Sequence, residues 1–253
     1  MKLVCIGSGN VATHMAQAFK DAGVKVLQVW SRQVDHAAVL ANKVDAAVLD
    51  DLDGADQNAD LYLICVKDDA IADVAAKLKN VKGLVVHTSG STDMSILNGC
   101  ARYGVLYPLQ TFSIAKELDF SQVPLCIEAS NTEELETLNG IARRISTNIY
   151  KATSGQRRSL HLAAVFASNF SNHLYHLSQL IVEEQGLDFS MLKPLIMETA
   201  EKVQQGLPLL VQTGPAIRHD EQTMQKQMAM LQSKHELSEI YKILSDSIKK
   251  THS

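Results

Sequence analysis

A glycine-rich run near the start of the chain has the residue types and spacing of a phosphate-binding loop. Gly7, Gly9 and Ala12 follow the apolar residues 3–6 and open an amphipathic stretch at residues 11–22. In such a strand–turn–helix the first glycine permits the tight turn, and the second lets the backbone approach a pyrophosphate. The third, small residue keeps helix and strand close, and amides at the helix N-terminus attract the anion. The sequence therefore predicts a dinucleotide site with the loop residues Gly7, Ser8, Gly9, Asn10 and Val11.

The end of the second predicted strand indicates which dinucleotide binds. A site that prefers NAD usually has Asp or Glu there, about twenty residues past the glycines. Here the strand KVLQVW ends in Ser31 and Arg32, so no carboxylate stands at that place. A hydroxyl followed by a guanidinium suits a 2′-phosphate, because Arg can hold it through two parallel hydrogen bonds. The sequence favours NADP(H); the alternative is that Arg32 is only a solvated surface residue.

Two further predicted strands end in polar residues that should line the same edge of the sheet. Ligands in open α/β sheets bind outside the carboxyl ends of the strands. The run CVKDDAI places Val66 and Lys67 at one such end, where they are expected to flank the ribose and nicotinamide half. The run VVHTSGS places Thr88 and Ser89 where the nicotinamide or a substrate would reach. His87 fits a hydrogen-bonded strand-end residue better than a catalyst.

Hydrophobic periodicity in the first 150 residues predicts a doubly wound, mostly parallel sheet. Short β-branched runs alternate with amphipathic stretches, the pattern of consecutive strand–helix–strand units. The near-continuous apolar character of the strands fits burial on both faces. The predicted strands are residues 4–6, 24–30, 61–66, 84–87, 105–107 and 125–128, and the clearest helices between them are 11–22 and 71–78. We therefore predict an α/β Rossmann domain that binds NADP over residues 1–152.

The remaining residues, 153–253, have the pattern of an all-helical domain. Thr153 and Gln156 have the spacing of a capping box, and a helical pattern follows to about residue 185. Further helical patterns cover about residues 190–205, 221–232 and 236–249, with a second capping-box match at Ser233 and Glu236. The Met-rich run TMQKQMAMLQ offers apolar faces that a domain of this size does not bury alone. We expect this domain to contribute an interface.

Composition and charge exclude several classes of protein. A net charge of -4 and a pI near 6.1 leave no basic surplus to neutralise a nucleic acid. The sequence has no apolar run of about 18 residues to cross a membrane, and its first apolar run is too short for a signal peptide. The 4 cysteines show no CxxC pairing, which favours buried thiols in a reducing compartment. We expect a cytoplasmic protein with no nucleic-acid or membrane partner. His173 and His176 lack a third ligand at convincing spacing, so no metal site is predicted.

Three further motifs carry a resemblance that runs essentially from end to end of the chain: YPLQTFS from Tyr107, HLAAVFASNF from His161 and TGPAIRHD from Thr213. With the glycine motif, they resemble a bacterial family of NADP oxidoreductases in which a Rossmann-like domain precedes a helical domain of unknown function. The N-terminal half is also similar to the Rossmann domains of pyrroline-5-carboxylate reductase and deazaflavin-dependent NADP reductases, which belong to the 6-phosphogluconate and β-hydroxyacid dehydrogenase superfamily. The resemblance implies an NADP(H)-dependent oxidoreductase and, because superfamily analogues usually dimerise through the helical domain, a homodimer.

The resemblance also points to catalytic residues on the first long helix of the second domain. Superfamily dehydrogenases commonly place a Lys and an Asn four residues apart there, to protonate and orient a substrate oxygen. Asn169 matches the Asn, whereas Val165 stands where the Lys would be. His161 stands one turn earlier, and histidine is a residue type suited to general acid catalysis at neutral pH. In a regular helix one face would carry His161, Val165, Ser168, Asn169 and Asn172. A buried hydrogen-bond network at a domain or dimer interface would explain the same polar strip.

The other two motifs add candidates. Relatives typically have His before the Pro of YPLQTFS; here Tyr107 stands in its place and could donate a proton. The residues expected to line the pocket beside it are Gln110, Thr111 and Ser113. In TGPAIRHD, Arg218 could clamp a carboxylate or phosphate of the substrate, the alternative being an ion pair with Asp220 or across domains. Asp220 is expected to cap the helix that follows.

Together these residues predict an NADP(H)-dependent oxidoreductase that reduces or oxidises a small polar carbonyl or imine substrate between the two domains. The predicted catalytic residues are His161, Asn169, Ser168, Arg218 and Tyr107. The alternative is an NADP-binding sensor or scaffold without turnover, which the missing Lys and the Tyr107 substitution favour.

Overall fold

The computed structural model describes residues 1–113, 115–116 and 118–253, which form two compact units, Met1–Asn169 and Phe170–Ser253. The sequence places the domain boundary between residues 152 and 153, where strand β8 (Ile149–Lys151) ends and helix α5 (Ser154–Ala164) begins. In the structure, α5 belongs to the first unit. The predicted domain boundary stays a prediction.

The first unit contains an eight-stranded sheet within the described residues, in the order β3-β2-β1-β4-β5-β6-β7-β8. Its strands are β1 (Lys2–Ile6), β2 (Lys25–Trp30), β3 (Ala47–Leu49), β4 (Leu61–Ile64), β5 (Leu84–His87), β6 (Tyr103–Pro108), β7 (Leu125–Ala129) and β8 (Ile149–Lys151). All neighbours pair in parallel except β6 and β7, which are antiparallel. The mostly parallel, doubly wound architecture is therefore confirmed, and the strand order reverses between β1 and β4.

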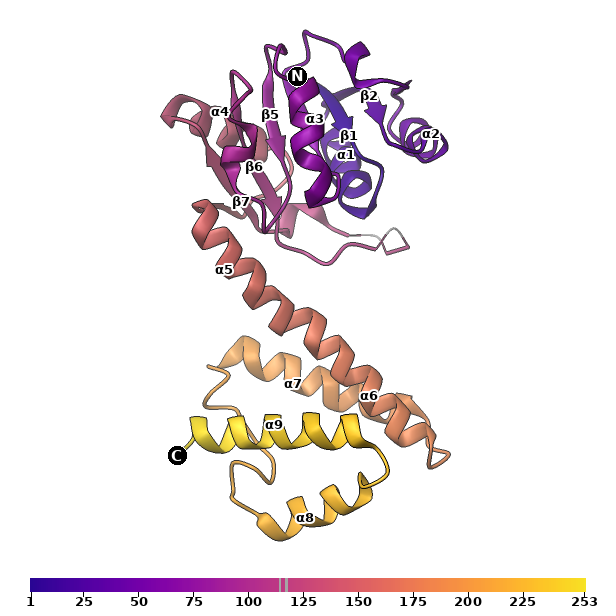
Figure 1. The fold of residues 1–253 in the computed structure, drawn as a ribbon, viewed down its shortest axis with the longest axis vertical. Coiled ribbons are helices and arrows are strands. Elements are labelled where there is room, and N and C mark those ends of the chain that lie inside the picture. Colours follow the sequence, from indigo (N-terminus) through magenta and orange to yellow (C-terminus); the bar gives the residue numbers. More distant parts are fainter. Residues whose placement is uncertain (114, 117) are drawn as a thin grey trace. The chain divides into compact units, whose positions relative to one another are not determined.

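Helices cover both faces of this sheet, as Figure 1 shows for α1 and α3. Leu3 and Cys5 of β1 pack on the face covered by α1 (Asn10–Asp21), α2 (Val34–Lys43) and α4 (Thr132–Ala142). Val4 and Ile6 pack on the opposite face, which is covered by α3 (Ile71–Lys77) and by short 3₁₀ turns. Because side chains alternate between two buried faces, the strands are apolar along their whole length.

The strands that sequence patterning missed lie at the edges of the sheet. β3 and β8 are three residues long, and most of their side chains are at least partly exposed. Such strands are too short to show a hydrophobic period, so patterning does not reveal them. The antiparallel orientation of β7 is likewise set by tertiary packing rather than by its own residues.

The helical region begins as its capping box predicts and continues through a change of helix type. Thr153 accepts a hydrogen bond from the Gln156 backbone, and the Gln156 side chain accepts one from the Thr153 backbone, so the capping box is confirmed. After α5 come a π-helix, Val165–Phe170, and α6 (Ser171–Glu183). The other helices described are α7 (Lys193–Gln205), α8 (Glu221–Met230) and α9 (His235–Thr251).

The start of α9 differs from the sequence prediction. Its N-cap residue is Lys234, which makes no side-chain capping bond, so the capping box predicted at Ser233 and Glu236 is wrong. Among the helices of the described residues, none combines the length and apolarity needed to span a lipid bilayer.

Candidate functional site

The glycine loop after β1 has the geometry of a pyrophosphate cradle. Gly7 has a φ of +122°, and a Cβ there would fall 2.2 Å from the carbonyl oxygen of Cys65, so only glycine fits. A Cβ on Gly9 would meet no atom within 4 Å, which leaves open space beside the backbone. Gly9 is the N-cap of α1 and no side chain caps the first turn, so the helix amides are free to bind an anion. Ala12 is fully buried against the sheet, as predicted for the third small residue. These features fit a dinucleotide.

The end of β2 lies against this loop. Ser8 donates a hydrogen bond from its hydroxyl to the hydroxyl of Ser31, at 2.9 Å. Arg32 follows with an exposed guanidinium that has no ion-pair or hydrogen-bond partner within the described part of the chain. Since α2 starts at Val34, also without a side-chain cap, a cation and a helix N-terminus stand side by side here. An anionic group on the ribose would therefore meet favourable charge.

The ends of β4 and β5 complete the same edge of the sheet. Val66 is half-buried and Lys67 is exposed just after β4. Thr88 is tied back to β4, because its amide and its hydroxyl both donate to the Ile64 carbonyl, at 3.1 and 3.3 Å. Ser89 begins a tight turn in which its hydroxyl accepts from the amides of the two residues 91 and 92. All the predicted cofactor residues thus lie at the carboxyl ends of four adjacent parallel strands.

Tyr107 and His161 form a hydrogen-bonded pair beside this edge. The phenolic oxygen lies 3.0 Å from Nδ1 of His161, and the rings meet edge to face at a centroid distance of 5.9 Å. Burial raises the pKa of Tyr107 to about 12, so the phenol keeps its proton at neutral pH. Both residues were predicted as catalytic, but their contact was not.

Gly90 brings the β5 turn into contact with that pair. A Cβ at Gly90 would fall 2.6 Å from Nδ1 of His161 and 2.9 Å from Cζ of Tyr107. The turn after β5, the end of β6 and the helix α5 therefore converge on one point. This contact could have been suspected from the glycine in VVHTSGS, because a glycine often marks a place where another group approaches the backbone closely.

The YPLQTFS segment is attached to α1. Asn10 donates from its side-chain amide to the carbonyl of Phe112 at 2.8 Å, and Nε2 of His14 lies 3.0 Å from the carbonyl of Ser113. A cavity of about 210 Å³ lies here; its lining includes Gln110, Thr111 and Ser113. The prediction that these three residues border a pocket is consistent with this cavity, although their role in binding stays a prediction.

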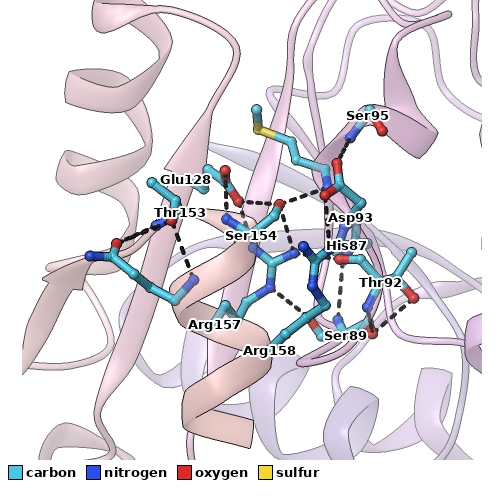
Figure 2. Close-up of polar contacts among 12 residues, drawn as sticks. His87, Ser89, Thr92, Asp93, Ser95, Glu128, Thr153, Ser154, Arg157 and Arg158 are labelled. Carbon is cyan, nitrogen blue, oxygen red and sulfur yellow. Dashed lines mark hydrogen bonds and ion pairs between the residues drawn. The ribbon is translucent and has the colours of Figure 1, made fainter.

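Sequence reasoning missed a buried polar cluster behind the site (Figure 2). Arg157 of α5 is fully buried and pairs with Glu128 of β7 at 2.6 Å. His87 is also fully buried; its Nδ1 accepts from the Ser89 amide at 3.2 Å, and its Nε2 has no hydrogen-bond partner among the described residues. Burial, with the nearby Arg157 charge, lowers the pKa of His87 to about 4, so the ring is neutral. Arg157 stands next to Arg158, and such a basic doublet is typical of a solvated helix face, but the structure buries Arg157.

The helix after α5 departs from regular α-helical spacing. Because the turns of the π-helix Val165–Phe170 take in more residues than α-helical turns, positions along it are displaced around the axis. The predicted polar face from His161 to Asn172 assumed regular α-helical spacing, so that assumption is wrong. Ser168 is half-buried and Asn169 is exposed. Their catalytic roles stay predictions, although π-helical turns are frequent at functional sites.

Arg218 belongs to the second unit and is exposed. Asp220 caps α8 by accepting from the Thr223 amide at 3.1 Å, as expected. The role of Arg218 as a substrate clamp, and the binding of substrate between the two domains, stay predictions.

Two family models match this chain. Residues 2–89 match a family described as NADP oxidoreductase, coenzyme F420-dependent. Residues 123–248 match one described as a domain of unknown function. No curated protein matches the chain.

Solved structures resemble it along nearly its whole length. A protein from Bacteroides fragilis named as an NADP oxidoreductase is 42% identical, with 98% of each chain covered and a TM-score of 0.92. A protein from Thermotoga maritima is 22% identical over 100% of this chain and 99% of its own, with a TM-score of 0.83. A reductive aminase from Aspergillus terreus, in complex with NADPH and ethyl levulinate, is 15% identical over 98% of this chain and 92% of its own, with a TM-score of 0.77. The last two likenesses show the fold. Through its identity with the first, the chain belongs to a family of NADP oxidoreductases, whose cofactor is a nicotinamide dinucleotide.

Proposed function

We propose that this protein is an NADPH-dependent reductase of a small polar compound with a carbonyl or imine group. The observation that carries the proposal is the hydrogen bond between the buried Tyr107 and the half-buried His161, beside the strand ends expected to hold the nicotinamide. A phenol that stays protonated at neutral pH is a suitable proton donor. The structural likeness to a reductive aminase supports the same class of reaction.

The reaction needs one hydride and one proton. Bound NADPH would supply the hydride that adds to the carbon of the C=O or C=N bond. The electron pair of that bond moves to the oxygen or nitrogen, which takes the phenolic proton of Tyr107. After the transfer, the proton on Nδ1 of His161 moves to the Tyr107 oxygen while Nε2 of the same ring takes up a proton from solvent, so the imidazole stays neutral. Val165 leaves no Lys at the superfamily position, so this pair takes over the role of the acid.

The preference for NADPH over NADH rests on Ser31 and Arg32. Ser31 is fixed against the glycine loop through Ser8, and the Arg32 guanidinium is exposed beside it. No intramolecular partner within the described residues competes for that guanidinium. A 2′-phosphate would give it a charge-assisted, two-pronged contact that NADH cannot make.

The test of the chemical role is the substitution Tyr107→Phe, assayed for NADPH oxidation with ethyl levulinate as a ketone and 2-methyl-1-pyrroline as an imine. Loss of a general acid should lower kcat by about 10²- to 10⁴-fold. The affinity for NADPH should be unchanged, because Tyr107 lies apart from the glycine loop. The matched control is Tyr103→Phe, at the other end of β6, which should keep full activity. Full activity of Tyr107→Phe would overturn the assignment. Tight NADPH binding without turnover of either probe would favour the sensor or scaffold instead.

We also propose that the protein is a homodimer through its helical region. Many large apolar side chains are exposed there, including Met191, Leu195, Met197, Leu210 and Met230. An apolar surface on this scale is typical of an interface between subunits. Light scattering should give about twice the chain mass of 27.7 kDa at micromolar concentration. A mass of one chain would contradict the proposal.

A further inference from the structure

Arg157 carries a buried charge that the proposed reaction does not use. Its side chain is fully buried near the start of α5, where an unpaired guanidinium would strongly destabilise the fold. Every branch of the guanidinium is engaged (Figure 2). Nη1 donates to Glu128 at 2.6 Å, and Nε donates to the Ser89 carbonyl at 3.1 Å. Nη2 donates to the Thr92 carbonyl and, at 3.2 Å, to the Ser154 hydroxyl.

The partners of this guanidinium are themselves fixed. Ser154 donates to Glu128 from its amide at 2.8 Å and from its hydroxyl at 2.7 Å. The same hydroxyl accepts from the Met94 amide at 3.0 Å. Glu128 on β7, the first turn of α5 and the segment after β5 are therefore joined in one network. A network in which each buried group is satisfied is rigid.

The two carbonyls held by Arg157 lie on either side of Gly90, the residue in contact with both rings of the Tyr107–His161 pair. The same segment, Ser89–Thr92, is also held by Ser91, whose hydroxyl donates to Asp68. The guanidinium that spans residues 89 and 92 therefore holds Gly90 against the two rings from the side of α5. His161 itself stands one helical turn after Arg157, so the same helix carries the ring and the group that fixes its neighbour.

We propose that Arg157 is the positioning residue of the Tyr107–His161 pair. It holds the segment Ser89–Thr92 so that Gly90 closes against the two rings and keeps the phenol aligned with the imidazole. This role deepens the proposed function, on which its catalytic consequence rests. The observation that favours this role is where the donors lead: Nε and Nη2 reach the carbonyls of Ser89 and Thr92, the two ends of the segment that carries Gly90.

The test is Arg157→Lys, which keeps the charge beside Glu128 but replaces the planar fork with a single nitrogen. The matched control is Arg102→Lys. Arg102 makes a two-pronged pair with the buried Glu134 at 2.7 and 2.9 Å, at the far end of β6. Two readouts are measured on the intact chain: the ring resonances of His161 by NMR with labelled histidine, assigned through His161→Gln, and steady-state kinetics with ethyl levulinate and 2-methyl-1-pyrroline.

For Arg157→Lys we expect shifted or broadened His161 resonances and a kcat lowered by about 10- to 100-fold, with the KM for NADPH changed less than about 2-fold. Arg102→Lys should leave both readouts as in the wild type. If Arg157→Lys does not fold, the double variant Glu128→Gln with Arg157→Met, which buries no charge, is used in its place. The expected results are the same.

A folded Arg157 variant with wild-type His161 resonances and wild-type kcat would overturn the proposal. If the wild type reduces neither probe, the NMR readout decides alone. Failure of the wild type to bind NADPH would count against the proposed function. The NMR comparison would then still decide whether Arg157 positions His161.

Discussion

At the scale of single residues, two glycines of one loop serve different ends. Gly7 is required by the fold, because its φ is +122° and its Cβ would collide with the Cys65 carbonyl. Gly9 is required only by the ligand, since its Cβ would meet nothing within 4 Å. We expect Gly7→Ala to lower the unfolding free energy by about 1–3 kcal/mol. Gly9→Ala should keep the melting temperature while weakening NADPH binding at least about 10-fold, as measured by thermal melts and titration. A Gly9→Ala variant that binds NADPH normally would mean that the pyrophosphate lies elsewhere.

His87 makes stability depend on pH. Its pKa is lowered to about 4 in the folded chain from 6.5, chiefly by burial. Between these values the unfolded chain binds a proton that the folded chain does not, so stability is lost as the pH falls from 6.5 toward 4. The loss should reach about 2–3 kcal/mol at pH 4.5 relative to pH 7.5. Urea unfolding at the two pH values should show it, and His87→Gln should have a correspondingly smaller difference. Equal differences in the two proteins would show that His87 is not neutral when folded.

At the scale of elements, the start of α5 positions both Arg157 and His161. The Thr153 hydroxyl accepts from the Gln156 amide in the first turn of this helix. Thr153→Ala should cost about 1 kcal/mol of stability and also lower kcat, because the helix start carries the buried network. Asn131→Ala removes the equivalent cap of α4, where Asn131 accepts from the Glu134 amide at 2.9 Å. It should cost about as much stability with no change in kcat. The stability of the two variants is compared by urea unfolding and their kcat by turnover. An equal loss of kcat in both would show that the start of α5 has no specific effect on the site.

The sequence predicted elements best where a local rule decides them. The strand, glycine turn and helix at residues 2–21 follow from periodicity and from the backbone freedom of glycine, and the structure agrees. Tyr107 and His161 are more than fifty residues apart in the sequence, and the partners of Arg157 lie about thirty to seventy residues away from it. Hydrophobic periodicity reports only local structure, so it predicts neither the pairing of Tyr107 with His161 nor the burial of Arg157. The π-helix at Val165–Phe170 was missed for a related reason, since nothing in its residue types distinguishes it from an α-helix.

At the scale of the whole molecule, we propose that one edge of a Rossmann sheet binds NADPH and presents it to a buried proton donor. The cofactor half of this claim can be tested without knowing the substrate. The chain has a single tryptophan, Trp30. It is the last residue of β2 and directly precedes Ser31 and Arg32. Quenching of its emission should therefore report binding at this edge.

The most direct measurement is a titration of the intact protein with NADPH and, separately, with NADH, followed by Trp30 emission. We expect NADPH to bind at least about 10-fold more tightly, in line with a charge-assisted contact to the 2′-phosphate. Arg32→Ala should abolish that difference and leave NADH affinity unchanged. Equal affinities in the wild type would contradict the role of Arg32, and no binding of either dinucleotide would contradict the account as a whole.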